Sequence, residues 1–199
     1  MKKIYHPRMD DKTIKIYEDS RFLEFFDLLM KLEGFSSNHP SDKGGVTMRG
    51  VTLKTWRNWK GDQNATFENS SIVEFKQLYY EEYYQKVPKH TNAEVHYHYF
   101  DMNVNSGYKN AHLLIHDCHQ AFKCYEWRSL YFKKLVMKNF NQYMFFKGWL
   151  NRLLTIAKYF EVEKNINYMK NVIAPYKLLT PKNYIFQIEK ELIEIEKTY

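Results

Sequence analysis

The stretch Asp19–Thr52, DSRFLEFFDLLMKLEGFSSNHPSDKGGVTMRGVT, joins an apolar run to a run that holds four of the chain's seven glycines. Its first half repeats large apolar side chains at spacings of three and four, which is the period of a helix with one buried face. The side chains of this stripe are Phe22, Phe25, Phe26, Leu29 and Leu32. The sequence therefore predicts a core-packed helix that leads into an open, glycine-rich segment.

We expect the helix to end at Glu33, because Gly34 follows and helices commonly end at a glycine in the left-handed conformation. Beyond it, turn signals at residues 43–45 and 49–50 alternate with valines and threonines, which favour extended backbone. A small β-hairpin is therefore expected between residues 36 and 52.

The composition favours a mainly α protein. Aromatic residues make up 18% of the 199 residues, while only 7 are glycine and 5 are proline, so few turns are expected. Apolar spacing and capping signals predict further helices over residues 52–61, 69–87, 93–108, 110–125, 126–160 and 181–199.

The formal net charge of +7 favours polyanionic partners, namely nucleic acid, anionic lipid or the bacterial cell wall. No apolar run reaches the roughly 18 residues that a membrane span needs. The N-terminus also lacks the apolar core of a signal peptide. We therefore expect a protein without a membrane span that is made in the cytoplasm.

The cysteines and histidines show no metal-site spacing. Cys118 and Cys124 fall in one segment predicted to be helical, where six residues put them about 9 Å apart along the axis and on different faces. That geometry is poor for a disulfide, so we expect two free thiols. His90, His96 and His98 lack a partner at ligand spacing, and no metal site is predicted.

Three side chains around the glycine-rich segment have the types that glycoside hydrolysis needs. One carboxylic acid protonates the leaving oxygen, and a second group activates water or attacks the anomeric carbon. Glu33 suits the acid, because an apolar helix carries it and Gly34 leaves room for a ligand. Asp42 and Thr47 are candidates for the second carboxylate and for orienting the water. Each residue alone has an ordinary alternative, a solvated helix end for Glu33 and a turn for Asp42.

The motif EGF…HPSDKGGVTMRGVT resembles the signature of the glycoside hydrolase family 108 muramidases, which are phage- and prophage-type lysozymes. The matching positions are Glu33, Gly34, Pro40, Asp42, Gly44, Gly45, Thr47, Gly50 and Thr52. Three later blocks resemble family blocks in the same order: LYYEEYYQKVP, FDMNVNSGYKNA and FFKGWLNR. The last is similar to the end of a small peptidoglycan-binding module. The resemblance covers roughly residues 20–155.

The resemblance implies a mainly α, α+β lysozyme-like fold with the small hairpin at an active-site cleft. It implies hydrolysis of the β-1,4 bond between N-acetylmuramic acid and N-acetylglucosamine, with Glu33 as general acid beside Asp42 and Thr47. It implies no cofactor. The partner is bacterial peptidoglycan, reached through a holin or a secretion pathway, so that the enzyme acts on the cell wall after release. No stable nucleic-acid partner is expected.

With this resemblance we expect four parts: a lead-in over residues 1–18, a catalytic domain over 19–110, a helical peptidoglycan-binding-like segment over 111–160 and a helical extension over 161–199.

Four residues are candidates for contact with the sugar. Asp101 and Asn105 lie one turn apart on one helix face, and their polar groups suit hydrogen bonds to N-acetyl and hydroxyl groups. Tyr84 is a candidate for stacking on a ring, and Gly45 lies in the motif itself. The alternative for Asp101 and Asn105 is a structural role, in which they cap and support the end of the helix. The alternative for Tyr84 is a position in the core.

Two other functions stay open at this stage. Phe35 and Ser36 stand where the family motif has glycine and tyrosine, which leaves room for a wall-binding protein without activity. The basic charge also fits a nucleic-acid-binding protein, whose binding would depend steeply on salt. That second alternative gives no reason for the residues between Leu32 and Thr52.

Overall fold

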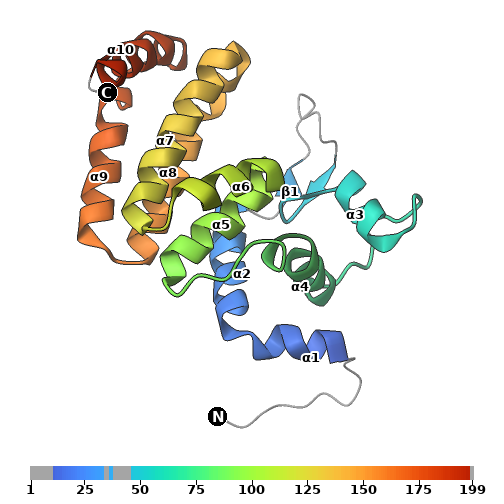
Figure 1. Ribbon diagram of the computed structural model, residues 1–199. Coiled ribbons are helices and arrows are strands. Elements are labelled where there is room, and N and C mark those ends of the chain that lie inside the picture. The colour runs from blue at the N-terminus through green and yellow to red at the C-terminus, as the bar shows by residue number, and fades with distance from the viewer. Residues whose placement is uncertain (1–10, 34–35, 38–45, 198–199) are drawn as a thin grey trace. The chain divides into compact units, whose positions relative to one another are not determined.

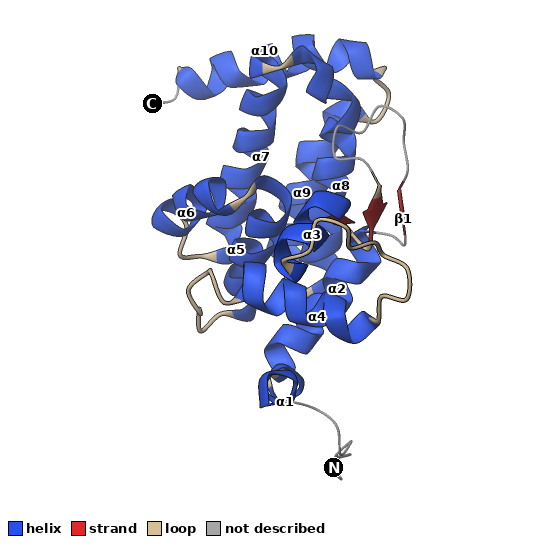
Figure 2. Ribbon diagram, turned by 90° about the vertical axis from the view of Figure 1, so that its right-hand side faces the viewer, coloured by secondary structure: helices blue, strands red, loops and turns tan. Residues whose placement is uncertain are grey.

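A computed structural model describes residues 11–33, 36–37 and 46–197 of the chain. Helices dominate it (Figure 1, Figure 2), which confirms the prediction of a mainly α protein. The α-helices are α1 Asp11–Glu18, α2 Ser20–Glu33, α3 Leu53–Lys60, α4 Ile72–Tyr79, α5 Ala93–Ser106, α6 Tyr108–Asp117, α7 Ala121–Lys138, α8 Tyr143–Tyr159, α9 Glu163–Ile173 and α10 Tyr184–Glu196. None of these described helices is long and apolar enough to cross a bilayer.

Shorter helices extend or connect these elements. A π-helical segment, η1 Tyr80–Tyr84, continues α4 directly, and three 3₁₀ turns are η2 Phe140–Gln142, η3 Ala174–Tyr176 and η4 Pro181–Asn183. The extra residue of a π turn shifts the faces of the side chains that follow it, and such turns are frequent at functional sites.

The predicted hairpin is part of a small antiparallel sheet of three two-residue strands in the order β1-β2-β3. The strands are β1 Ser36–Ser37, β2 Thr47–Met48 and β3 Val51–Thr52. Each residue of β2 pairs with one of β3, so Arg49 and Gly50 alone form the turn. Both have positive φ, 49° and 79°, as the favoured two-residue hairpin turn requires.

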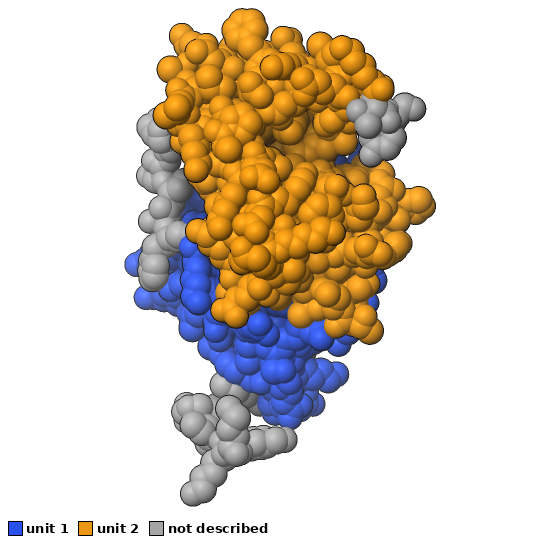
Figure 3. Space-filling view, turned by 90° about the vertical axis from the view of Figure 1, so that its left-hand side faces the viewer, with its two compact units in different colours: residues 1–89, 100–111 blue, residues 90–99, 112–199 orange. Residues whose placement is uncertain are grey.

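By its internal contacts the chain divides into two compact units (Figure 3). Unit 1 contains residues 1–89 and 100–111, and unit 2 contains residues 90–99 and 112–199. Helix α5 is therefore shared, with its first half in unit 2 and its second half in unit 1. The functional boundaries expected at residues 18, 110 and 160 stay predictions.

The core of unit 1 is built around the predicted stripe of α2. Phe22, Phe25 and Phe26 are each at most 1% exposed. Their rings pack on Tyr84, Phe100 and Tyr79, with centroid separations of 5.1, 6.2 and 5.7 Å in that order. Because aromatic rings hold this face of α2, the C-terminal end of the helix is fixed in unit 1.

Helix α1 differs from the expectation of an irregular lead-in. Its Ile16 is 1% exposed, and the Thr13 hydroxyl accepts a hydrogen bond from Gln77 Nε2 of α4 at 2.8 Å. These are contacts between segments about 60 residues apart, which local periodicity does not reveal. Packing on α4 therefore orders a segment whose own sequence predicts little.

The two cysteines do not share a helix, so the geometric premise of the sequence analysis was wrong. Helix α6 ends at Asp117 and α7 begins at Ala121. This break brings the Cys124 thiol to the Cys118 carbonyl oxygen, at 3.9 Å. The Cys118 side chain and then burial raise the pKa of Cys124. Both cysteines are buried and free, as predicted.

The interior of unit 2 holds a cluster of polar side chains, which we call the Glu94 network: Glu94, His98, Tyr125, Arg128 and Asn165. Each is at most 4% exposed. The Glu94 carboxylate accepts hydrogen bonds from the Tyr125 hydroxyl at 2.7 Å and from Asn165 Nδ2 at 3.0 Å. Arg128 Nη1 lies 3.1 Å from His98 Nδ1, and because arginine only donates, that nitrogen accepts.

The Glu94 network gives unit 2 a pH-dependent stability. Burial raises the pKa of Glu94. The hydrogen bonds from Tyr125 and Asn165 lower it, but by less than burial raises it. The folded state then binds the proton more tightly than the unfolded state, so stability falls as the pH rises from the ordinary glutamate pKa of 4.5 through the raised pKa of Glu94. The glutamine side chain of Glu94→Gln cannot ionise, so this variant lacks the loss of stability with rising pH that Glu94 causes.

We therefore expect the melting temperature of wild type, relative to that of Glu94→Gln, to be lower at about pH 8 than at about pH 4. A difference between the two proteins that stays constant over this range would contradict the raised pKa of Glu94.

Candidate active site

Glu33 is the last residue of α2, where the sequence predicts it. Its side chain is half-buried, and its Oε1 atom is closed off from solvent. The packed rings earlier in α2 fix the backbone that carries it. The chain thus presents a carboxyl group at a defined place, next to the turn between β2 and β3.

Within that turn, Gly50 lies close to Glu33. A Cβ atom at Gly50 would lie 2.9 Å from both Cγ and Oε2 of Glu33, and 2.8 Å from the Tyr79 hydroxyl oxygen. Real side chains do not approach this closely, and the φ of 79° also favours glycine. Gly50 therefore lets the hairpin backbone contact the Glu33 side chain.

Two tyrosines, one from α4 and one from η1, lie near this turn. The Tyr79 hydroxyl donates a hydrogen bond to the Arg49 carbonyl oxygen at 2.8 Å, which ties α4 to the turn. The Tyr83 ring lies 5.4 Å from that of Tyr79. Burial raises the pKa of Tyr83, and the negative charges of Glu82 and Glu33 raise it further. Tyr83 is therefore a neutral hydroxyl close enough to sense the charge of Glu33.

Thr47 lies in β2, opposite Thr52 of β3, and is half-buried. Thr52 begins α3 by accepting a hydrogen bond from the Thr55 backbone N–H at 3.2 Å, so the hairpin leads directly into a capped helix. Asp42 and Gly45 lie outside the described residues. The separation between the two proposed carboxyl groups accordingly stays a prediction.

The structure shows the surroundings of three other predicted sugar contacts. Tyr84 is 3% exposed, and its hydroxyl lies 3.3 Å from Asp19 Oδ1. Asp101 is 0% exposed, and the side chain of the exposed Asn105 donates back to its carbonyl oxygen at 2.8 Å. The structure places Tyr84 and Asp101 in the core of unit 1, in agreement with the alternatives of a core ring and a helix-end buttress.

The sequence analysis did not single out Tyr79, although it lies in the LYYEEYYQKVP block. Its hydroxyl contact depends on how the hairpin meets α4, across 30 residues of sequence. The available signal was the four-residue spacing of Tyr79 and Tyr83, which puts their rings on neighbouring turns of one helix.

Two of the three histidines considered in the sequence analysis lie in the protein interior. His96 and His98 are fully buried, and His98 belongs to the Glu94 network. Among the described residues, no group of three or more histidine, cysteine, aspartate or glutamate side chains has the geometry of a metal site.

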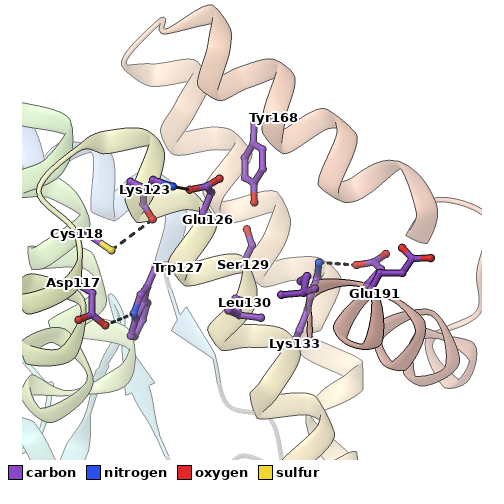
Figure 4. A pocket seen from close by; sticks show the side chains of 12 residues that line it. Asp117, Cys118, Lys123, Glu126, Trp127, Ser129, Leu130, Lys133, Tyr168 and Glu191 are labelled. Carbon is purple, nitrogen blue, oxygen red and sulfur yellow. Dashed lines mark hydrogen bonds and ion pairs between the residues drawn. The ribbon is translucent and has the colours of Figure 1, made fainter. Parts of the chain in front are cut away.

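Unit 2 contains a second candidate site, a pocket of about 630 Å³ between α7, α9 and α10 (Figure 4). Charged side chains in its wall form hydrogen bonds and ion pairs with other side chains of the protein. Asp117 accepts from the Trp127 indole N–H at 3.0 Å, and the Lys133 ammonium pairs with Glu191 at 2.6 Å. Lys123 pairs with Glu126 at 2.7 Å. These pairs stabilise the wall of the pocket.

One comparison with known proteins covers the segment that contains Glu33. Residues 26–107 match the family model described as glycosyl hydrolase 108. Among curated proteins, none matches the chain. Of solved structures, SagA of Brucella abortus is 17% identical, over 77% of this chain and 94% of its own, with a TM-score of 0.38. That likeness is too low to support any conclusion about fold or function.

Proposed function

Because residues 26–107 match the model of glycosyl hydrolase family 108, we propose that this chain is a lysozyme that cleaves bacterial peptidoglycan between N-acetylmuramic acid and N-acetylglucosamine. The observation that carries the proposal is the position of Glu33. It is the one carboxyl of the matched motif within the described residues, and it lies against the hairpin turn at Gly50.

In the proposed reaction, the Glu33 carboxyl donates its proton to the glycosidic oxygen as the bond from that oxygen to C1 breaks. Positive charge develops on the sugar ring in the transition state. Water then supplies a hydroxyl group to C1, and its proton passes to a base. Asp42 and Thr47 are the residues that we propose for activating and orienting that water, by their positions in the motif.

The surroundings of Glu33 suit an acid in this reaction. The Glu33 side chain is half-buried, and its Oε1 atom is closed off from solvent. Tyr83 near it is uncharged, because burial raises the pKa of its hydroxyl. The Tyr83 hydroxyl is therefore a polar group near Glu33 that carries no charge.

We further propose that the positive surface holds the enzyme on the wall. A net charge of +7 favours an anionic polymer, and the effect decreases with salt. Release to the wall through a holin or a secretion pathway remains part of the same proposal.

The proposal is tested by digesting purified peptidoglycan and reducing the newly formed sugar ends before mass spectrometry. We expect N-acetylmuramic acid at the new reducing ends. New ends at N-acetylglucosamine would contradict the choice of bond. Retention on the polymer without any released fragment would contradict hydrolysis, and it would favour a wall-binding protein that has lost activity.

A further inference from the structure

Unit 2 carries a group of large apolar side chains that are open to solvent. We call them the exposed apolar patch, and its members are Met137, Phe140, Met144, Phe145, Leu178 and Phe186. Each is at least 37% exposed, and Leu178 is 98% exposed. Single exposed apolar residues are ordinary on a protein surface, whereas a group of this size indicates a surface that a partner covers.

The segments that carry the patch pack together at one end of unit 2. The turn η2 connects the end of α7 to the beginning of α8, and η4 packs on both α8 and α10. Phe146, the neighbour of Phe145, is buried, and its ring centroid lies 5.0 Å from that of Tyr176 in η3 and 6.1 Å from that of Tyr184 in α10. This end of unit 2 is at the top of both Figure 1 and Figure 2.

The charges that border the patch are mostly positive. Residues 127–160 and 164–188 contain no aspartate or glutamate. Beyond the patch in α10, Glu189 is followed by Lys190, so these two residues add no net charge. Five lysines border the patch, four of them exposed and the third of the series half-buried: Lys134, Lys138, Lys147, Lys177 and Lys182. An apolar centre with lysines around it matches the chemistry of an anionic lipid surface.

We propose that the exposed apolar patch docks on the surface of an anionic phospholipid bilayer. The phenylalanine, methionine and leucine side chains enter the boundary between headgroups and acyl chains, and the lysine ammonium groups bind the lipid phosphates. The binding is peripheral and reversible. This inference goes beyond the proposed cleavage of peptidoglycan and does not depend on it.

A second copy of this chain and a nucleic acid fit the patch less well. In a two-fold symmetric dimer through this surface, the lysines of one copy would oppose those of the other, which is unfavourable. A nucleic acid attracts lysines and stacks on aromatic rings, but it has no apolar layer to cover Leu178 and Met144. An anionic bilayer supplies both the negative charge and the apolar layer.

The first test is sedimentation of the full chain with vesicles of phosphatidylglycerol and phosphatidylethanolamine, and with vesicles of phosphatidylcholine alone. At about 0.1 M salt we expect binding to the anionic vesicles and little to the neutral ones, with weaker binding at about 0.5 M salt. Failure to bind the anionic vesicles would overturn the proposal. So would a concentration-dependent dimer, or binding to a single-stranded oligonucleotide, that Phe186→Ser disrupts while vesicle binding is unchanged.

Phe186→Ser tests the apolar contribution of the patch. Phe186 is 72% exposed, so we expect the fold to tolerate serine there. Partitioning onto anionic vesicles should fall about tenfold, since one aromatic side chain no longer leaves water. Leu113→Ser is the matched control, because Leu113 is 49% exposed in α6 and lies in unit 2 outside the patch. Equal losses in both variants would contradict docking through the patch.

Lys138→Gln tests the charge that borders the patch. One lysine close to an anionic surface is expected to strengthen binding about fivefold. Lys158→Gln removes the same charge at the other end of α8, roughly 22 Å along the helix from Tyr143, and should change binding less than about twofold. If both variants bind equally weakly, net charge alone accounts for the binding and the proposal is wrong.

A fluorophore at position 144 reports whether the patch itself enters the lipid. Cys118 and Cys124 are buried, so Met144→Cys, at a site that is 67% exposed in wild type, offers an accessible thiol for a polarity-sensitive label. We expect its emission to shift to the blue on anionic vesicles, while the same label in Leu113→Cys does not shift. An unshifted label at position 144 on protein that sediments with the vesicles would contradict the proposed orientation.

Discussion

Glu33→Gln is expected to lower the rate of peptidoglycan cleavage by about a hundredfold or more, the usual contribution of a general acid. Glutamine keeps the size and polarity of the side chain but has no acidic proton to give. Because Glu33 is half-buried at the end of α2 and the substitution is isosteric, we expect the melting temperature to change little. The rate of release of soluble fragments, compared at equal amounts of folded protein, measures the effect.

Glu24→Gln is the matched control for this prediction. Glu24 lies on the same helix but is exposed, so the substitution removes the same charge away from the turn. Its rate should stay within about twofold of wild type, as expected for an exposed site. Similar losses in both variants would show that the charge of α2 matters and that Glu33 has no special role.

Gly50→Ala is expected to lower activity by a similar factor, for a different reason. The new methyl group would lie 2.9 Å from Glu33 Oε2 and 2.8 Å from the Tyr79 oxygen. Tyr79 is fixed by its packed ring, so the Glu33 side chain is the part that moves. A displacement of about 1 Å of a reacting group can cost about a hundredfold in rate. The positive φ of 79° adds about 1–2 kcal/mol of backbone strain.

Gly61→Ala separates strain from displacement. Gly61 has a φ of 67°, and a Cβ there would meet nothing within 4 Å. We therefore expect both alanine variants to lose similar stability in chemical denaturation, while only Gly50→Ala loses activity. An active Gly50→Ala enzyme would mean that the hairpin turn does not set the position of Glu33.

The helix and hairpin of the motif were predictable because their signals are local. The apolar stripe of α2 specifies its buried face, and a glycine marks its end. The pair Arg49-Gly50 predicts a turn, and the structure adds the positive φ at both residues. These features need no knowledge of distant contacts.

The predictions that failed concern features that contacts beyond the local sequence determine. Helix α1 is ordered by contact between Thr13 and Gln77, and the cysteines meet across a break after Asp117. Aromatic content alone also could not tell Tyr84, which lies in the core, from Tyr83, which lies near Glu33. Both residues lie in the π-helical segment η1, whose extra residue shifts the faces of its side chains from those of a regular helix.

The most direct test of Glu33 as the acid is the structure of Glu33→Gln in complex with a peptidoglycan tetrasaccharide that it binds but does not cleave. We expect the glycosidic oxygen between N-acetylmuramic acid and N-acetylglucosamine to lie within about 3.2 Å of the side chain at position 33. A bound glycan whose glycosidic oxygens all lie beyond hydrogen-bond reach of that side chain would contradict the role of Glu33.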